Sequence, residues 1–521
     1  MKRSRLAMNR TLMPLLAALL AIQPLGDALA AGPVAAGSRP VARETSPRPL
    51  KGREAKARAE LEARLRGHIV ELASDAYQGR EPGTDGETKT LRYIGRQWFD
   101  IGLQSGTNNP LHPWFAPVEI IGRDPSVSRG FFSRKGKRAY VPDGTMLVLT
   151  SGKRSLVENA PVIFVGSGNR VPPQAELAGK VALLLDGGIE DSHRQDALLK
   201  GGALAVITVL DGERSLDTVA AYRKRTAFAL ASDKPESELE AFLTPQGLDA
   251  VLAGTGLDLA KLQSEAATAG FTPRLIDLGV SLEATTRETR IRTHNIIGKL
   301  PGRRPEAGAV LVLAHWDHFG ECAEPPAEDL ICNGAVDNAS GIAVMTEIAR
   351  RLADWPGLER DVYFLATTAE EIGFLGARAF AENPPLPLGR IVAAFNIDTV
   401  ALAPAGRPFE IIGRGLTPLD PQIEAYARSA RRPIAPGNAA APYAHRQDGW
   451  ALLKYGVPAV MISSSWSDIA LVEAFMESDY HRPGDKVSRG LVLGGAADDV
   501  EFHVGLVRWF ADPRRVPQRA K

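Results

Sequence analysis

The stretch AVLVLAHWDH (residues 309–318) joins a continuous apolar run to a cluster of polar side chains. A short apolar run of this kind is typical of a strand that is buried on both faces. His315, Asp317 and His318 follow directly, at the carboxyl end of the predicted strand. The stretch therefore predicts a buried parallel strand with chemically active groups where it ends.

The same alternation of apolar strands and amphipathic helices continues from Ile291 onward. Such alternation is typical of βαβ units, in which helices cover both faces of a sheet. The predicted fold class is therefore α/β, with a mixed, mainly parallel central sheet. We expect a helix at 340–353 and further strands at 362–367, 391–397 and 458–462.

The chain before this region predicts two amphipathic helices and a separate insert. Leu61, Leu65, Ile69 and Leu72 lie on one helical face. A second helix is expected near Asp85, because Thr84 and Glu87 have the spacing of a capping box. Short β-rich runs then indicate a smaller inserted domain. The expected parts are 61–123 and 278–512 for the main domain, 124–277 for the insert and 513–521 for a C-terminal tail.

The first thirty residues have the pattern of a secretory signal peptide. Four basic residues precede or enter an apolar run from Leu12 to Leu25, and Ala28-Leu29-Ala30 resembles a cleavage site. A membrane anchor is the alternative, but the run is shorter than the ~20 residues that span a bilayer. We expect an exported protein, periplasmic or extracellular, with no membrane contact after cleavage. Residues 31–60 predict a flexible linker, because they are rich in Pro, Ala, Arg and Ser.

Composition and cysteine usage agree with an exported globular protein. The net charge is +1, from 62 Lys plus Arg and 61 Asp plus Glu, with no basic stripe, so we expect no nucleic-acid partner. Cys322 and Cys332 are the two cysteines. An oxidising compartment favours a disulfide between them, and two buried free thiols are the alternative.

Imidazoles and carboxylates recur wherever a predicted strand ends. Beside His315, the sequence places Asp337 before a helix, Glu370-Glu371 and Asp398 after the next strands, and His481 after the last. Each residue alone has a structural explanation, such as a helix cap or a surface position. Together they form the nitrogen and oxygen ligand set that zinc uses in open, hydrolytic sites.

Two details of this set suggest separate roles within it. Asp317 stands two residues after His315, and residues two apart in a strand share a face. We therefore expect the Asp317 carboxylate to accept the second ring proton of His315, with a surface salt bridge as the alternative. In the doublet Glu370-Glu371 the carboxylates repel each other unless cations are near, so one is expected to bind metal while the other serves as a base.

At this point the chain resembles the M28 zinc aminopeptidases, the dinuclear co-catalytic type, with an inserted protease-associated (PA) domain. The resemblance covers most of residues 61–512, and weaker support comes from 78–84 and 295–298. It depends on the order and spacing of AHWDH (314–318), NGAVDNASG (333–341), AEEIG (369–373), NID (396–398) and Tyr480-His481.

The resemblance implies a role for each matching residue. Asp337 would bridge two zinc ions, His315 and Asp398 would complete one metal site, and Glu371 and His481 the other. Glu370 would be the general base, and Asp317 is counted with it as a catalytic residue. The resemblance also implies a cis peptide after Asp337 and makes the insert PA-like.

The chain departs from the family in one place. Where relatives commonly have Ser-Asp-His before the last core strand, it has Gln447-Asp448-Gly449. We expect the change to alter the substrate pocket and not the metals. His445 is read as a surface residue, Trp316 is expected in the core, and His318 is a candidate to line the cleft.

The function expected from these features is removal of N-terminal residues from peptides. A carboxypeptidase or dipeptidase on the same scaffold is one alternative, and a receptor-like binding protein without catalysis is another, because fold alone does not fix function. The chain has no Gly-Xaa-Ser-Xaa-Gly turn, Walker-type loop or His-Glu-Xaa-Xaa-His motif. Serine hydrolases and phosphate-loop enzymes are therefore disfavoured.

Overall fold

The computed structural model describes residues 50–167, 170–186, 191–212, 214–233, 238–355, 357–487 and 490–517. The chain forms two compact units, one of Met1–Val118 with Arg292–Lys521 and one of Glu119–Ile291. The expected signal peptide lies outside the described residues. Among the helices that are described, none is both long enough and apolar enough to cross a membrane.

The first unit is built on a mixed, mainly parallel sheet, which confirms the predicted fold class. Four inner strands are parallel, and antiparallel strands lie on either side of them. The two outer strands were not expected. The order is β16 (Glu410–Ile412), β17 (Ala459–Ser463), β15 (Ile391–Asn396), β11 (Ala309–His315), β14 (Asp361–Thr367) and β10 (Arg274–Leu300), beside which β1 (Gln104–Ser105) pairs.

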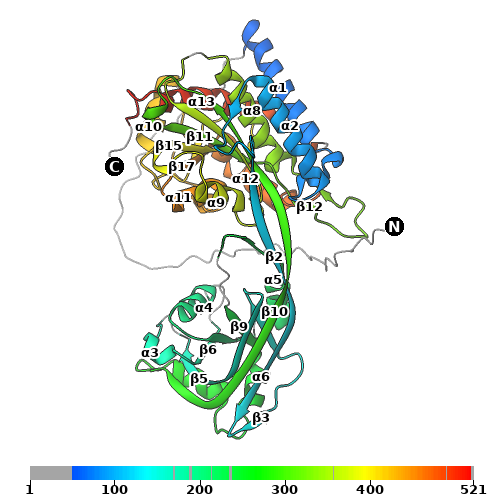
Figure 1. Ribbon diagram of the computed structural model, residues 1–521, viewed down its shortest axis with the longest axis vertical. Helices are drawn as coiled ribbons and strands as arrows, with labels where there is room; N and C mark the ends of the chain where they lie inside the picture. The colour runs from blue at the N-terminus through cyan, green and yellow to red at the C-terminus, as the bar shows by residue number, and fades with distance from the viewer. Residues whose placement is uncertain are drawn as a thin grey trace, which may run out of the picture. The chain divides into compact units, whose positions relative to one another are not determined.

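Helices cover both faces of this sheet, as Figure 1 shows around β11, β15 and β17. Along β11, Val310, Val312 and Ala314 belong to one core, whereas Leu311 and Leu313 belong to the other. The first core also contains α1 (Arg53–Leu72), α2 (Asp85–Ile101), α8 (Ser340–Ala353), α10 (Asp420–Ala430) and α13 (Leu493–Ala511). The second contains α9 (Leu375–Glu382) and α11 (Asp448–Lys454).

The first helix begins earlier than the sequence suggests. Residues 31–60 were expected to be a linker, yet α1 starts at Arg53. The start of α1 has no apolar periodicity and is held by polar contacts. The Arg58 guanidinium donates to Asp498 at 3.0 Å and to Glu62 at 3.0 Å. The start of α2 is as predicted, because the Thr84 hydroxyl accepts from the Glu87 amide.

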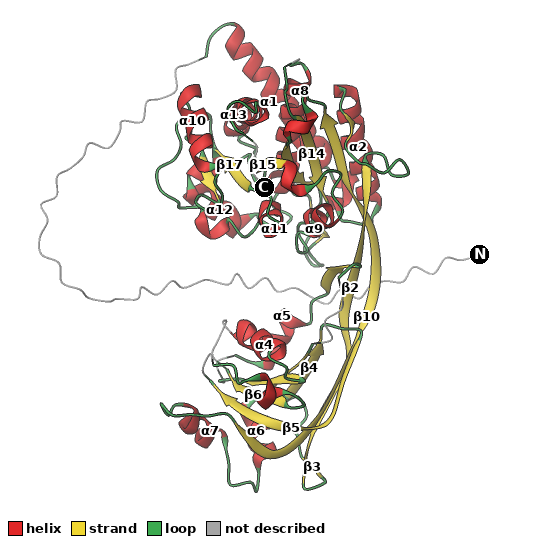
Figure 2. Cartoon of the chain, turned by 60° about the vertical axis from the view of Figure 1, so that its left-hand side comes forward, coloured by secondary structure: helices red, strands yellow, loops and turns green. Residues whose placement is uncertain are grey.

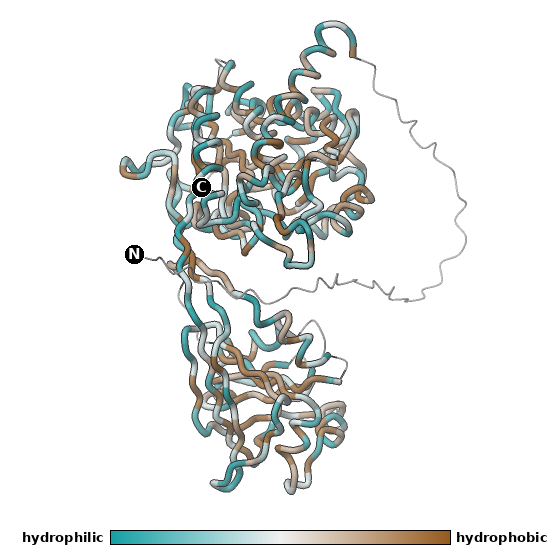
Figure 3. Tube along the Cα trace, turned by 90° about the vertical axis from the view of Figure 1, so that its right-hand side faces the viewer, coloured by the Kyte–Doolittle hydropathy of each residue, from teal (hydrophilic) through white to brown (hydrophobic). Residues whose placement is uncertain are grey.

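The second unit also contains helices on both faces of a sheet. Its strands β5 (Arg154–Gly166), β6 (Val181–Leu185), β7 (Ala205–Val209) and β9 (Leu239–Leu243) are parallel, and β4 (Met146–Thr150) is antiparallel to β9. Figure 2 shows α4 on one side of these strands and α6 and α7 on the other, and Figure 3 shows the hydrophobic trace inside the unit. The remaining elements are β2 (Phe115–Arg134), β3 (Lys137–Ala139), β8 (Ala227–Leu230), α3 (Gln174–Leu177), α4 (Asp191–Lys200), α5 (Leu216–Arg223), α6 (Pro245–Leu252) and α7 (Leu259–Ala266).

A disulfide joins Cys322 to Cys332, which confirms the predicted pairing. The two cysteines flank a loop closed by the short strands β12 (Gly320–Glu321) and β13 (Ile331–Cys332). The loop lies between the segment with His315 and the segment with Asp337.

Candidate metal centre

The predicted ligands come together because the parallel strands end at one edge of the sheet. His315 is the last residue of β11. Glu371 follows β14, and Asp398 follows β15. Asp337 precedes α8, and His481 follows α12 (Ile469–Ser478). The site is therefore assembled from segments up to 166 positions apart in the chain.

Asp337 lies at the centre of the site and offers one oxygen to each side. Its Oδ1 is 3.1 Å from the Nε2 of His315, which is in turn 3.7 Å from Asp398 Oδ1. Its Oδ2 is 3.4 Å from the Nε2 of His481, which is 3.0 Å from Glu371 Oε2. The five side chains thus form two groups that share one carboxylate, and the peptide after Asp337 is cis.

The donor set fits a bound divalent cation. Asp337 Oδ2 and His481 Nε2 face each other without a hydrogen-bond partner among the described residues. His315, Asp337 and Asp398 also place one ligand atom each within 4.8 Å of one another. A buried imidazole nitrogen and carboxylate oxygens that converge in this way are the ligand types that a metal ion such as zinc binds.

Several carboxyl groups crowd this buried region, and a cation would offset their charge. Burial raises the pKa of Asp317 to about 7 and the pKa of Asp448 to about 6, with Glu371 adding to both. Burial also raises the pKa of Glu370 well above its usual value, although His315 opposes the shift and Glu371 reinforces it. Burial lowers the pKa of His481, but the same crowding of acids raises it to about 9, so the site favours bound positive charge.

The link between His315 and Asp317 differs from the prediction. His315 Nδ1 lies 3.1 Å from the backbone carbonyl of Asp317, whereas the carboxylate is 3.8 Å away. Strand β11 ends at His315, so the rule that residues two apart share a face does not extend to Asp317. The carboxylate of Asp317 instead accepts from the backbone amide of Glu370 at 3.2 Å and so positions that residue.

His318 contacts the ligand Glu371. Its Nδ1 is 2.5 Å from Glu371 Oε1, while Glu371 Oε2 faces His481. A carboxylate can only accept, so Nδ1 carries the proton of this bond. His318 therefore orients Glu371, a role that the sequence did not define. Trp316, by contrast, is buried in the core as expected.

Two positioning residues were missed by sequence reasoning. Asp485 accepts from the backbone amides of Val336 at 2.8 Å and Asp337 at 3.0 Å, which ties the central ligand to the segment with His481. Arg80 is fully buried and donates to four backbone carbonyls. These belong to Leu72, Trp316, Asn333 and Gly334. Arg80 belongs to the stretch 78–84, to which no role was assigned from the sequence.

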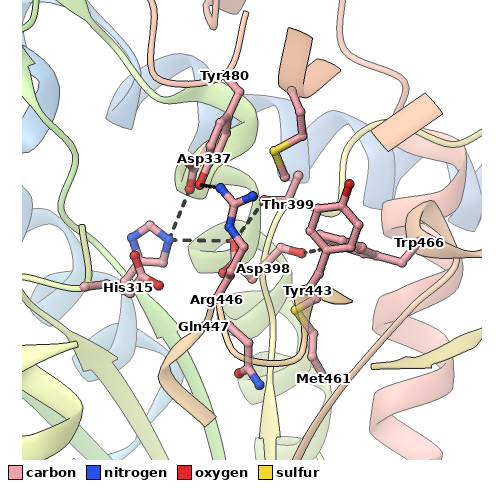
Figure 4. Close-up of a pocket in the computed structure, with 12 residues that line it drawn as sticks. His315, Asp337, Asp398, Thr399, Tyr443, Arg446, Gln447, Met461, Trp466 and Tyr480 are labelled. Atoms are coloured by element: carbon pink, nitrogen blue, oxygen red, sulfur yellow. Dashed lines mark hydrogen bonds and ion pairs between the residues drawn. The ribbon is translucent and has the colours of Figure 1, made fainter. Parts of the chain in front are cut away.

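A pocket opens beside the ligands, as Figure 4 shows. Its polar wall includes the ligands of one group and Glu370, and its other wall is largely apolar or aromatic. Gln447 lines the pocket while its Oε1 caps α11 through the Gly449 amide at 2.7 Å. His445 is exposed and contacts Trp450. The remaining lining residues are Thr399, Tyr443, Arg446, Met461, Trp466, Met476 and Tyr480.

Comparison with known families identifies the segment that carries this site. Residues 295–496 match peptidase family M28, and all five ligands and Glu370 fall inside the match. The segment that holds the predicted ligands is therefore similar to the peptidases of that family. The aminopeptidase from Aneurinibacillus sp. strain AM-1 shares the fold, with a TM-score of 0.50 and 20% identity over 86% of this chain and 93% of that one.

Two curated relatives match shorter segments. Aminopeptidase YwaD of Bacillus subtilis (strain 168) is 34% identical over 123 residues, which are 23% of this chain and 24% of that protein. The alkaline phosphatase isozyme conversion protein of Escherichia coli (strain K12) is 34% identical over 102 residues, or 18% of this chain and 29% of that protein. The chain thus matches less than a third of the length of either relative.

Proposed function

We propose that the protein is a dinuclear zinc aminopeptidase that removes N-terminal residues from peptides. The observation that carries the proposal is Asp337, which presents one oxygen to His315 and Asp398 and the other to Glu371 and His481. A shared carboxylate with one ligand pair on each side is the arrangement that suits two metal ions. The names of an M28 relative and of the structural neighbour favour an aminopeptidase over a carboxypeptidase.

The residues around the proposed metals have separate tasks. A zinc pair supplies Lewis acidity, which lowers the pKa of water and polarises a peptide carbonyl. Glu370 accepts the proton of the attacking water and passes it to the leaving amine. Burial raises the pKa of Tyr480 well above its usual value, so its hydroxyl stays protonated as a donor in the pocket.

The proposal is tested by loading the purified chain with zinc and measuring the metal content and the hydrolysis of leucine para-nitroanilide. We expect hydrolysis that a chelator abolishes and added zinc restores. The acetylated substrate should be inert, because an aminopeptidase needs the free amine. Equal hydrolysis of both would refute the aminopeptidase assignment, and no hydrolysis despite bound zinc would favour a binding protein.

We also propose that the chain is exported and that its second unit is a PA-like module. Export is supported by the charge and apolar pattern of residues 1–30 and by the disulfide between Cys322 and Cys332. The PA-like assignment is supported by the resemblance of residues 124–277. N-terminal sequencing of protein from the exported fraction tests the first point, and a start at Met1 would contradict cleavage.

A further inference from the structure

Arg446 differs from every other side chain that lines the pocket. It is the one arginine or lysine among the described lining residues, and its neighbours on the polar wall are Asp337, Glu370 and Asp398. Figure 4 shows its guanidinium directed into the same space as Tyr480 and Asp337. The described pocket lining therefore combines three carboxyl groups with one guanidinium.

The charge of Arg446 is not neutralised within the described chain. Its guanidinium forms no ion pair there, unlike that of Arg407, which pairs with Asp468 at 3.2 Å. It donates to the Tyr480 hydroxyl at 3.4 Å and lies 5.8 Å and 5.6 Å from the ring centroids of Tyr443 and Tyr480. Arg446 is an exposed residue beside these two rings, and its other donors are open to a ligand.

Arg446 is also close to the proposed reaction centre. The ring of Tyr480 stacks on that of the ligand His481, with centroids 3.6 Å apart. Tyr480 thus contacts both Arg446 and a predicted ligand. A substrate whose peptide bond lies at the ligands would bring its groups next to that bond within reach of Arg446.

We propose that Arg446 is a binding site for a carboxylate of the substrate. Guanidinium recognises carboxylate through two parallel hydrogen bonds, and no carboxylate of the described chain pairs with this guanidinium. The carboxylate comes either from the C-terminus of a dipeptide or from an acidic side chain beside the scissile bond. The substrate class is therefore short or acidic peptides, an inference that builds on the proposed peptidase function.

Calorimetric binding to the zinc-loaded Glu370→Ala protein tests the site without turnover. Leu-Gly is compared with Leu-Gly amide, and Leu-Glu amide with Leu-Gln amide. With Arg446 present, we expect the acidic member of one pair to bind about tenfold to a hundredfold more tightly. The first pair reports a terminal carboxylate and the second an acidic side chain.

In the same protein, the additional change Arg446→Gln should make the affinities of the two members of a pair equal. Arg446→Lys should restore part of the preference. Arg428→Gln is the matched control, because Arg428 is exposed on α10 and does not line the pocket. If Arg446 only supports Tyr480, Arg446→Gln should weaken the binding of both members of a pair equally. If neither pair shows a preference, or if the preference survives Arg446→Gln, the carboxylate site is wrong.

The two proposals fail in different ways. If the unmodified protein hydrolyses both members of each pair equally well, the peptidase assignment is retained and the role of Arg446 is wrong. Discrimination in binding without any hydrolysis would overturn the peptidase and support the carboxylate site.

Discussion

Replacing His318 with alanine should weaken zinc binding at the half of the centre formed by Glu371 and His481. The ring nitrogen of His318 lies 2.5 Å from Glu371 Oε1, and both side chains are almost completely buried. Without this donor, Glu371 loses the contact that turns its other oxygen toward His481. The protein should then bind the zinc of that half less tightly while keeping the other zinc.

The magnitude follows from the one hydrogen bond that is removed. A hydrogen bond to a charged group contributes about 1.5–3 kcal/mol, and about 1.4 kcal/mol corresponds to a tenfold change in affinity. We therefore expect a loss of about tenfold to a hundredfold, which is also the usual effect of removing a group that orients a metal ligand. His318→Asn should retain most of the affinity, since its amide nitrogen can replace Nδ1.

The assay is competition for zinc with a chromogenic chelator, performed on the folded protein. Thermal unfolding is recorded in parallel, because both variants remove a buried ring. His445→Ala is the matched control, since His445 is an exposed histidine that does not line the pocket. If His318→Ala binds both zinc ions as tightly as the parent, or if His318→Asn loses as much affinity as His318→Ala, the orienting role is wrong.

Three further predictions concern other residues. Glu370→Ala should keep both metals but lower kcat by about a hundredfold to ten-thousandfold, and a full rate with unchanged metal content would remove Glu370 from the mechanism. Asp337→Ala should lose both metals, which elemental analysis would show; retention of two zinc ions would contradict the bridge. Burial of Glu347 opposes its ionisation, but hydrogen bonds from His68, Arg64 and Arg350 outweigh burial and lower its pKa to about 2. The resulting stability, about 3 kcal/mol, is present above pH ~4.5 and is lost as the pH falls toward 2. Urea unfolding should show Glu347→Gln less stable by that amount at pH 7, with the difference gone near pH 2; a difference independent of pH would contradict the shift.

The parts of the fold and site that the sequence predicted are those with a local pattern. Continuous apolar runs marked strands β11, β14, β15 and β17, and parallel strands bring their carboxyl ends to one edge. The sequence alone therefore predicts that His315, Glu371 and Asp398 lie close together. The outer strand β10 has no such run, because its apolar residues alternate from Ile276 to Ala284 and a mostly polar stretch follows.

The contacts that hold the ligands in place could not be predicted, because they join distant segments through the backbone. Arg80 donates to carbonyls more than 230 positions away, and Asp485 accepts from amides about 150 positions away. Backbone groups carry no residue-specific signal, so no pattern points to such partners. The role of Asp317 was misjudged for a local reason, since the strand ends before it.

Anomalous diffraction at the zinc edge, measured on crystals of the zinc-loaded protein, tests the proposed metal pair most directly. The geometry of Asp337 predicts two peaks about 3.5–4 Å apart, one beside His315 and Asp398 and the other beside Glu371 and His481. A single peak, or peaks that lie away from Asp337, would contradict the dinuclear centre.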